Sequence, residues 1–352
     1  MSFQQNLLRW FQENKRALPW RRHYDPYAVW VSEMMLQQTQ MRTALPYYER
    51  WMRQFPTIAA LAKADAQSVM KAWQGLGYYA RARNLHESAQ RITKEFAGRF
   101  PEDFDTIRSL KGIGRYSAGA IASIAFNQKR PLVDGNVFRV LSRTHAISAP
   151  IDDAKNKETF WTLQESLIPD NARDFNQALM ELGALICTAQ NPACAVCPIR
   201  RFCKANKTGN PENYPVKLKK KKIVQVTAGA LALESNGKYF IHLRPLGEIM
   251  GGLWEFPEWK LSKNKPLTLH QIKSALTKHA NQDLKLPLPA IKHFGSIKRN
   301  YTHHLETLHV FAGYLSGPAK PKSAWRSLWA EQKDFSSLPF SSAHAKIIEL
   351  LK

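Results

Sequence analysis

Large hydrophobic side chains return every three or four positions through the first part of the chain, which is the period of a helix with one buried face. The pattern begins at residue 26, and proline or glycine interrupts it at 55–57, 75–77 and 100–101. Residues 117–126 form a further helical stretch of mostly small side chains. An all-α domain is therefore predicted for about the first two hundred residues.

The pattern changes after a lysine-rich segment at residues 216–224. Hydrophobic and polar residues then alternate as in β-strands at 224–228 and 239–243, and a third strand is expected at 309–314. We therefore predict a smaller α+β domain over residues 225–352. The basic segment is interpreted as a solvated linker, or as a linker that also touches phosphates.

Length and charge narrow the class of partner. With 352 residues the chain is expected to hold two or three domains, and 44% hydrophobic residues suffice for real cores. The formal net charge of +23 favours a polyanionic partner. A membrane surface would also attract this charge, but no apolar run of about 18 residues and no lipidation signal is present. Nucleic acid is therefore favoured, and the lack of a signal peptide predicts a cytoplasmic protein.

The four cysteines of the chain lie close together, with gaps of six, two and five residues. Thiols stay reduced in the cytoplasm, which disfavours disulfides. Zinc usually takes two close pairs held a dozen or more residues apart, whereas here one close pair has two near neighbours. The spacing favours a four-iron–four-sulfur cluster, with zinc as the alternative. The proposed ligands are Cys187, Cys194, Cys197 and Cys203.

A glycine-containing turn stands before the small-residue helix. Gly112 and Gly114 free the backbone to turn and expose N–H groups, and Lys111 adds a cation. Such a hairpin grips a DNA phosphate without reading sequence, although many loops between helices also contain two glycines. Asp134 follows twenty residues later, before a glycine. It is placed either to cap a helix or to stabilise a sugar cation.

Glu33 lies within an apolar stretch. A lone glutamate there is either on the outer face of its helix or half-buried with a raised pKa. Two carboxylates in unlike surroundings can divide the acid and stabiliser roles in glycosidic cleavage, and Glu33 and Asp134 are candidates for such a pair.

Taken together, these motifs resemble the MutY-type adenine DNA glycosylases, within the endonuclease III-like helix-hairpin-helix superfamily. The resemblance covers nearly the whole chain. It is carried by the cysteine spacing, by the hairpin with its later aspartate, and by three strings, 18–21, 32–39 and 75–85.

The resemblance implies a domain plan. A helix-hairpin-helix glycosylase domain with one [4Fe-4S] cluster is expected over residues 1–215, with a six-helix part at about 25–130 and a cluster part at 1–24 plus 131–215. A basic linker follows at 216–224. A Nudix-like domain is expected over 225–352, where residues 252–257 carry the likeness. No glutamate-rich metal-binding helix follows that string, so the domain is interpreted as a binder rather than a pyrophosphatase.

The resemblance also implies a reaction, the hydrolytic removal of adenine paired with 8-oxoguanine or guanine in duplex DNA. Glu33 would protonate the flipped adenine and Asp134 would stabilise the sugar cation, with Asn136 as an orienting partner. Tyr116 stands where strand-cutting relatives carry a lysine, so a monofunctional enzyme that leaves an abasic site is expected. A packing tyrosine is the alternative.

Further residues are carried over from the same resemblance. Gln38 and Tyr78 would wedge into the base stack, and Arg21 would line the adenine pocket. The loop that recognises 8-oxoguanine would be Tyr301, Thr302 and His303, although two surface histidines, His303 and His304, are the plain alternative.

The sequence departs from the family pattern at two places. Lys111 replaces a common proline in the hairpin, and Phe138 replaces a lysine found in some relatives. A monomer without membrane attachment, at the bacterial nucleoid, is expected. A damage-binding scaffold without catalysis is disfavoured, because Glu33 and Asp134 are both present.

Overall fold

The computed structural model describes residues 1–218, 223–286, 288, 290–301, 303–315 and 321–351. Its contacts divide the chain into two compact units: Met1–Lys63 with Glu87–Lys219, and Ala64–His86 with Lys220–Lys352. This division assigns residues 64–86 to the second unit, whereas the helical domain expected from the sequence runs unbroken over 1–215. Among the described residues, no helix combines the length and the apolar character needed to cross a bilayer.

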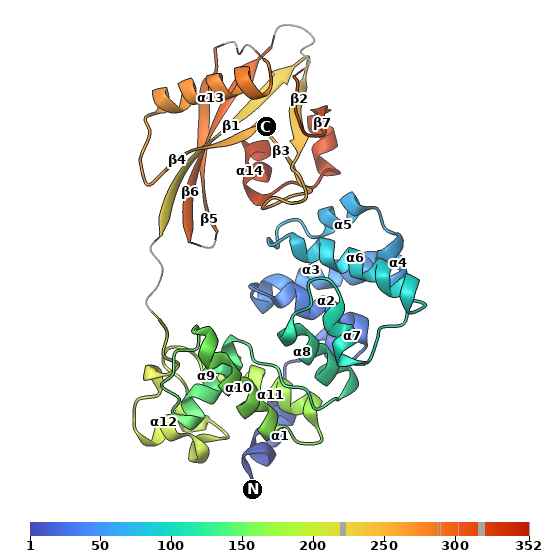
Figure 1. Cartoon of the computed structure of the whole chain (residues 1–352), viewed down its shortest axis with the longest axis vertical. Coiled ribbons are helices and arrows are strands. Elements are labelled where there is room, and N and C mark those ends of the chain that lie inside the picture. The colour runs from blue at the N-terminus through green and yellow to red at the C-terminus, as the bar shows by residue number, and fades with distance from the viewer. Residues whose placement is uncertain (219–222, 287, 289, 302, 316–320, 352) are drawn as a thin grey trace. The chain divides into compact units, whose positions relative to one another are not determined.

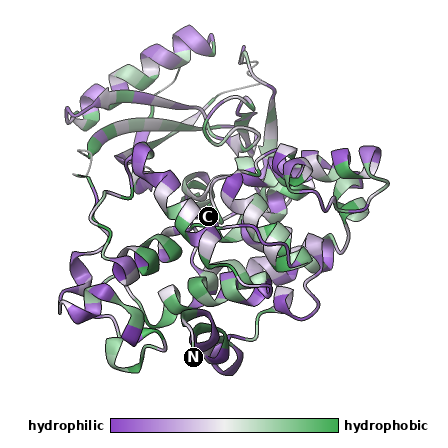
Figure 2. Cartoon of the chain, turned by 60° about the horizontal axis from the view of Figure 1, so that its bottom comes forward, coloured by the Kyte–Doolittle hydropathy of each residue, from purple (hydrophilic) through white to green (hydrophobic). Residues whose placement is uncertain are grey.

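The first unit is helical, as predicted (Figure 1). Along these helices hydrophobic and hydrophilic residues alternate (Figure 2). The helices are α1 (Phe3–Asn14), α2 (Pro26–Leu36), α3 (Met41–Gln54), α4 (Ile58–Lys63), α7 (Phe104–Ser109), α8 (Arg115–Phe126), α9 (Gly135–His145), α10 (Ala154–Leu167), α11 (Ala172–Leu185) and α12 (Lys204–Lys207).

Helices α2 and α8 pack against each other at the centre of this unit. The predicted small-residue helix is confirmed as α8, which is buried from Ser117 to Ala125. A Cβ at Gly119 would lie 2.0 Å from the carbonyl oxygen of Pro131, so only glycine lets the segment before α9 cross α8 this closely. That crossing places Asp134, the first residue before α9, beside the central helices.

The second unit contains α5 (Ala66–Ala72), the start of α6 (Ala80–Glu95) and the C-terminal sheet. Trp254 Nε1 donates to Gln67 Oε1 at 3.0 Å, and Lys71 Nζ donates to the carbonyl of Leu338 at 2.8 Å. Polar contacts thus join α5 to the sheet within this unit.

The C-terminal sheet confirms the three predicted strands and adds others. Strands run in the order β3-β2-β1-β6-β5, with β4 paired to β1 and β7 paired to β2. Strands β1 and β6 are parallel, and the other pairs are antiparallel. The elements are β1 (Val224–Ser235), β2 (Lys238–Leu243), β3 (Trp254–Glu255), β4 (Glu258–Lys263), α13 (Leu269–Asp283), β5 (Lys292–Tyr301), β6 (His304–Tyr314), β7 (Ser327–Glu331) and α14 (Ser342–Leu350).

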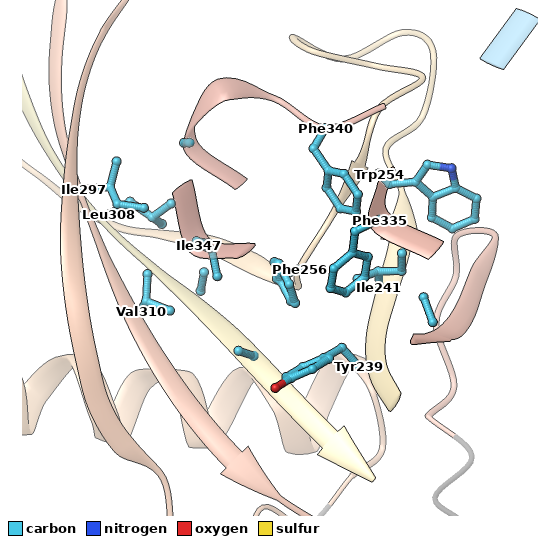
Figure 3. Packing of buried hydrophobic residues seen from close by; sticks show 14 of the residues in the cluster. Tyr239, Ile241, Trp254, Phe256, Ile297, Leu308, Val310, Phe335, Phe340 and Ile347 are labelled. Carbon is cyan, nitrogen blue, oxygen red and sulfur yellow. The ribbon is translucent and has the colours of Figure 1, made fainter. Parts of the chain in front are cut away.

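Both faces of this sheet are covered, because successive side chains of a strand point to opposite faces. On one face Ala228, Ala230 and Ala232 of β1 join a core that includes Ile347 of α14 and the phenylalanines drawn in Figure 3. On the other face β1 supplies Leu231 and Leu233 to a core with α13. A buried β1 with leucines on one face and alanines on the other leaves room for a helix on each side.

Candidate active site

Glu33 is carried by a helix that is buried almost all round. The side chain of Asp25 caps α2 by accepting the Ala28 N–H at 2.8 Å, and Pro26 occupies the first turn. Every residue from Val29 to Met35 is buried, and Glu33 is 4% exposed. The buried alternative for Glu33 is therefore confirmed.

Burial, with a smaller contribution from the negative charge of Asp134, raises the pKa of Glu33 to about 7. Two groups oppose this: Tyr116, whose Oη donates to Glu33 Oε2 at 2.9 Å, and the cation of Arg21. Burial also raises the pKa of Tyr116 well above its usual value, so the phenol keeps its proton. At neutral pH Glu33 therefore populates both its protonated and its ionised form.

Asp134 caps α9, which is one of the two roles predicted for it from the sequence. Its Oδ1 accepts the Val137 N–H at 2.7 Å, and its Oδ2 accepts Nδ2 of Asn136 at 3.0 Å. Burial raises the pKa of Asp134, while these two hydrogen bonds lower it. Capping and chemistry do not exclude each other, because each carboxylate oxygen has two acceptor sites.

One cavity of about 740 Å³ is lined by all four residues predicted to be catalytic. This volume lies in the range of pockets that bind small-molecule ligands, about 300–1,000 Å³. The predicted residues that line it are Arg21, Glu33, Gln38, Tyr116, Asp134 and Asn136. The hairpin residues do not line it, and Tyr78 and the 301–303 segment belong to the second unit.

A second ionic group in this cavity escaped the sequence interpretation. Glu181 of α11 accepts both Arg16 Nε at 2.7 Å and Arg21 Nη2 at 3.0 Å, and Arg21 Nε also donates to Gln177. Burial would raise the pKa of Glu181, but the hydrogen bonds from the two arginines lower it to about 2. A lone glutamate among apolar residues, the signal that marked Glu33, also marks Glu181 at 178–182.

Two residues predicted to enter DNA have unusual backbones. Gln38, at the rim of the cavity, has φ +58°, and Tyr78 in the second unit has φ +48° and is 59% exposed. Residues other than glycine rarely adopt such angles, which cluster where a side chain must be presented. The guanidinium of Arg81 lies 5.5 Å from the centroid of the Tyr78 ring.

The hairpin between α7 and α8 has the expected geometry. Gly112 has φ +79°, which favours glycine, and Gly114 is the N-terminal cap of α8, with open space above its Cα. Lys111 forms an ion pair with Glu87 of α6. Phe138, where some relatives carry a lysine, packs edge-on against Phe160 at 5.0 Å between ring centroids.

All four cysteines line a single apolar pocket. Burial, with smaller contributions from the other three cysteines, raises the pKa of Cys197 to about 12. Four cysteine sulfurs around one pocket fit a cationic iron–sulfur cluster. Arg143, 1% exposed, donates to Cys187 Sγ at 3.3 Å and to the carbonyl of Thr188 at 2.7 Å, which holds the loop around the pocket.

A chain of hydrogen bonds joins this loop to the cavity. Arg139 donates through Nε to the carbonyl of Cys187 at 2.7 Å and through Nη2 to Asn136 Oδ1 at 2.8 Å. Asn136 in turn donates to Asp134. The orientation of Asp134 is thereby tied to the cysteine loop.

The C-terminal sheet buries acidic residues of its own. Glu258 accepts Arg299 Nη2 at 2.6 Å, and Arg299 Nε also donates to Glu306 at 2.5 Å. Arg244 Nε donates to Glu255 at 2.6 Å. Guanidinium groups thus occupy the space between these carboxylates.

The predicted 8-oxoguanine loop lies at the β5–β6 turn. Strand β5 ends at Tyr301, whose backbone pairs with His304, and His303 is exposed. Thr302 lies outside the described residues.

Comparison with known proteins agrees with this geometry. Residues 31–166 match the HhH-GPD superfamily base excision DNA repair proteins, residues 187–203 match the iron-sulfur binding domain of endonuclease III, and residues 228–350 match the NUDIX domain. The chain therefore holds a [4Fe-4S] cluster through its four cysteines.

Full-length relatives narrow the family. The adenine DNA glycosylase of Rattus norvegicus is 34% identical over 403 residues, which cover 99% of this chain and 78% of that protein. An adenine DNA glycosylase of Buchnera aphidicola (subsp. Acyrthosiphon pisum) is 33% identical over 355 residues, which cover 99% of this chain and 97% of that protein. A thermostable thymine-DNA glycosylase superposes with a TM-score of 0.54 at 28% identity, covering 58% of this chain and 95% of that one. This chain belongs to the adenine DNA glycosylases, DNA-binding hydrolases of N-glycosyl bonds in base excision repair.

Proposed function

We propose that the protein excises adenine paired with 8-oxoguanine or guanine in duplex DNA, and that it leaves an abasic site without cutting the strand. The observation that carries this proposal is Glu33. It is a buried carboxyl with a pKa of about 7, bonded to Tyr116, in a cavity that also holds Asp134. A pKa near the working pH is what a general acid that later acts as a base requires.

The substrate adenine must leave the base stack to reach this cavity. Arg16 and Arg21 in its wall carry N–H donors, and Glu181 holds both arginines in place. Because the pKa of Glu181 is about 2, its carboxylate stays ionised at neutral pH. Four N–H groups of Arg16 and Arg21 fill the acceptor sites of this carboxylate, so Glu181 orients the two arginines rather than binding the base itself.

Glu33 then transfers its proton to a ring nitrogen of the adenine. The bond between the sugar C1′ and the base breaks, its electron pair leaves with adenine, and the sugar becomes an oxocarbenium ion. Asp134, held by Val137 and Asn136, faces this cation with its negative charge. Water adds at C1′ and gives its proton to the Glu33 carboxylate, which restores the acid.

Tyr116 supports the monofunctional outcome. A phenol cannot form the imine by which an amine nucleophile cleaves the strand, and its raised pKa keeps it a hydrogen-bond donor to Glu33. Its role is to hold the acid rather than to attack the sugar.

The remaining assignments follow the family likeness. Lys111, Gly112 and Gly114 would hold the DNA backbone, Gln38 and Tyr78 would enter the stack, and Tyr301, Thr302 and His303 would contact 8-oxoguanine. We further infer a monomer that works in the cytoplasm at the nucleoid. The cluster, when bound, cross-links the loop of Cys187, Cys194, Cys197 and Cys203 through iron–sulfur bonds.

The test uses duplexes with a single 8-oxoguanine–adenine or guanine–adenine pair, labelled on the adenine strand. We expect strand breakage only after hot alkali, with an adenine–thymine duplex left intact. Breakage without alkali would overturn the monofunctional assignment. Binding without breakage in either condition would overturn the roles of Glu33 and Asp134.

A further inference from the structure

The hairpin before α8 carries two cations, and an acidic side chain from another helix holds each of them. Lys111 pairs with Glu87 of α6. Arg115 donates through Nη1 and Nη2 to the two carboxylate oxygens of Glu158 in α10, at 2.6 and 3.0 Å. The Arg115 guanidinium also lies 4.3 Å from the ring centroid of Trp161. Each cation beside the glycine turn thus pairs with one carboxylate.

These pairs lie where a phosphate would compete for the cations. The side chains of Lys111 and Glu87 are 64% and 45% exposed, and those of Arg115 and Glu158 are 37% and 66% exposed. A charged pair this exposed is weak and exchanges partners readily. A polyanion that reaches the hairpin therefore meets both cations and both carboxylates.

We propose that Glu87 and Glu158 mask the hairpin cations and so limit how tightly the protein binds DNA that contains no mispair. Each phosphate contact by Lys111 or Arg115 requires the cation to leave its carboxylate. The carboxylate left behind then repels the phosphates. A chain with a net charge of +23 would otherwise bind any duplex strongly and release it slowly.

This inference rests on duplex DNA as the substrate and adds two residues that set affinity. The masking acts at the start of α8, where Arg115 immediately precedes Tyr116 of the cavity. It thus acts on the part of the DNA backbone that the start of α8 would contact, one residue before the cavity-lining Tyr116.

The test is the double substitution Glu87→Gln and Glu158→Gln in the full-length protein with its cluster. Binding to an undamaged duplex is measured by fluorescence anisotropy over a series of salt concentrations. We expect the affinity at low salt to rise about three- to ten-fold. We also expect the plot of log affinity against log salt to become steeper by up to about one for each released cation.

The matched control is Asp170→Asn. Asp170 is also an exposed acid paired with a lysine, Lys129. Its backbone carbonyl accepts a hydrogen bond from Asn127, at the far end of α8, about 18 Å along the helix from the hairpin. This variant removes a negative charge without unmasking the hairpin, so the steepness of its salt plot is expected to stay at the wild-type value.

Two results would overturn the masking. One is an equal gain of affinity and an unchanged salt slope in the double variant and in the control. The other is weaker binding by Glu158→Gln, which would mean that Glu158 braces Arg115 for the phosphate. An unchanged thermal midpoint shows that each variant is folded. Adenine excision by the wild type, assayed alongside, keeps a failure of the masking separate from a failure of the proposed function.

Discussion

Glu33 in the helical unit and Glu258 in the C-terminal sheet are both buried carboxyls, yet their pKa values move in opposite directions. Glu33 accepts a hydrogen bond from the neutral phenol of Tyr116, and burial raises its pKa to about 7. Burial acts in the same direction on Glu258, but its hydrogen bond with His344, together with the hydrogen bond and positive charge of Arg299, holds its pKa well below the usual range. Burial alone therefore does not decide which acid is chemically active; the bonded partner decides.

The contrast also holds inside the active-site cavity. Glu181 lines the same cavity as Glu33, but two arginines keep its pKa near 2. One carboxyl is thus poised to exchange a proton while the other stays an anion. Buried acids with raised pKa values are functional candidates, whereas buried acids paired with arginine are more often structural or binding groups.

The largest expected effect is on the rate of adenine excision, when Glu33 can no longer donate a proton. Glu33→Gln keeps the shape of the side chain but cannot donate a carboxylic proton. We expect adenine excision from an 8-oxoguanine–adenine duplex to slow by about 10²–10⁴-fold under single-turnover conditions, the usual worth of a general acid. Binding of the same duplex serves as the control. A variant that cleaves within a few-fold of wild type would remove Glu33 from the mechanism.

The next-largest expected effect tests the buried carboxylates that pair with arginine in the C-terminal sheet. Arg299→Met would leave Glu258 and Glu306 buried without their guanidinium, at a cost of about 3–5 kcal/mol in the free energy of unfolding. Denaturant unfolding of the full chain measures it. Lys298→Met is the matched control, since Lys298 is exposed on the same strand and should change stability by less than about 0.5 kcal/mol. Equal stability of the two variants would mean that the cluster is not a structural charge pair.

The sequence was enough to predict the architecture and to mark Glu33 as a candidate acid, because both depend on local pattern. Helical periodicity, a Gly-x-Gly turn and a cysteine cluster can each be recognised within one short continuous segment of the sequence. The same holds for Glu33, an acid inside an apolar stretch. The break between α2 and α3 at Gln37–Gln40 was missed, since no proline or glycine marks it and Gln38 takes a left-handed backbone instead.

Long-range pairing could not be predicted from the sequence. Glu181 meets Arg16 across 165 residues, and Arg299 meets Glu258 across 41. Nothing in the pattern around either acid shows that a cation will arrive from elsewhere in the fold. The sequence therefore marks buried acids, and only the fold separates those that exchange protons from those that do not.

The third prediction concerns the effect of the raised pKa of Glu33 on the free energy of unfolding. Its pKa is about 7 when folded and about 4.5 when unfolded, so between these values the folded protein binds the extra proton. Stability therefore falls as the pH rises from about 4.5 to about 7. Glu33→Gln removes this loss and should be more stable than wild type by up to about 3 kcal/mol at pH 8. At pH 4 the difference should be small.

Denaturant unfolding at the two pH values measures this difference. Glu13→Gln, at an exposed position of α1, is the control and should show no such pH dependence. A Glu33→Gln variant that gains nothing at pH 8 would mean that Glu33 ionises without cost in the folded protein.

The smallest expected effect comes from removing one hydrogen bond, the one that Tyr116 donates to Glu33. Tyr116 lowers the pKa of Glu33 by donating to its carboxylate, so Tyr116→Phe should raise that pKa. The single-turnover excision rate of wild type should fall as the pH rises above about 7, where Glu33 loses its proton. In the variant this fall should move to higher pH by less than about one unit, the worth of one neutral hydrogen bond.

Tyr27→Phe provides the matched loss of a buried hydroxyl, because Tyr27 donates to the carbonyl of Phe55 and does not line the cavity. Its pH profile should coincide with that of wild type. A fall that moves to lower pH in Tyr116→Phe would mean that the phenol favours the protonated acid. The difference between Glu33 and Glu258 would then rest on more than the charge of their partners.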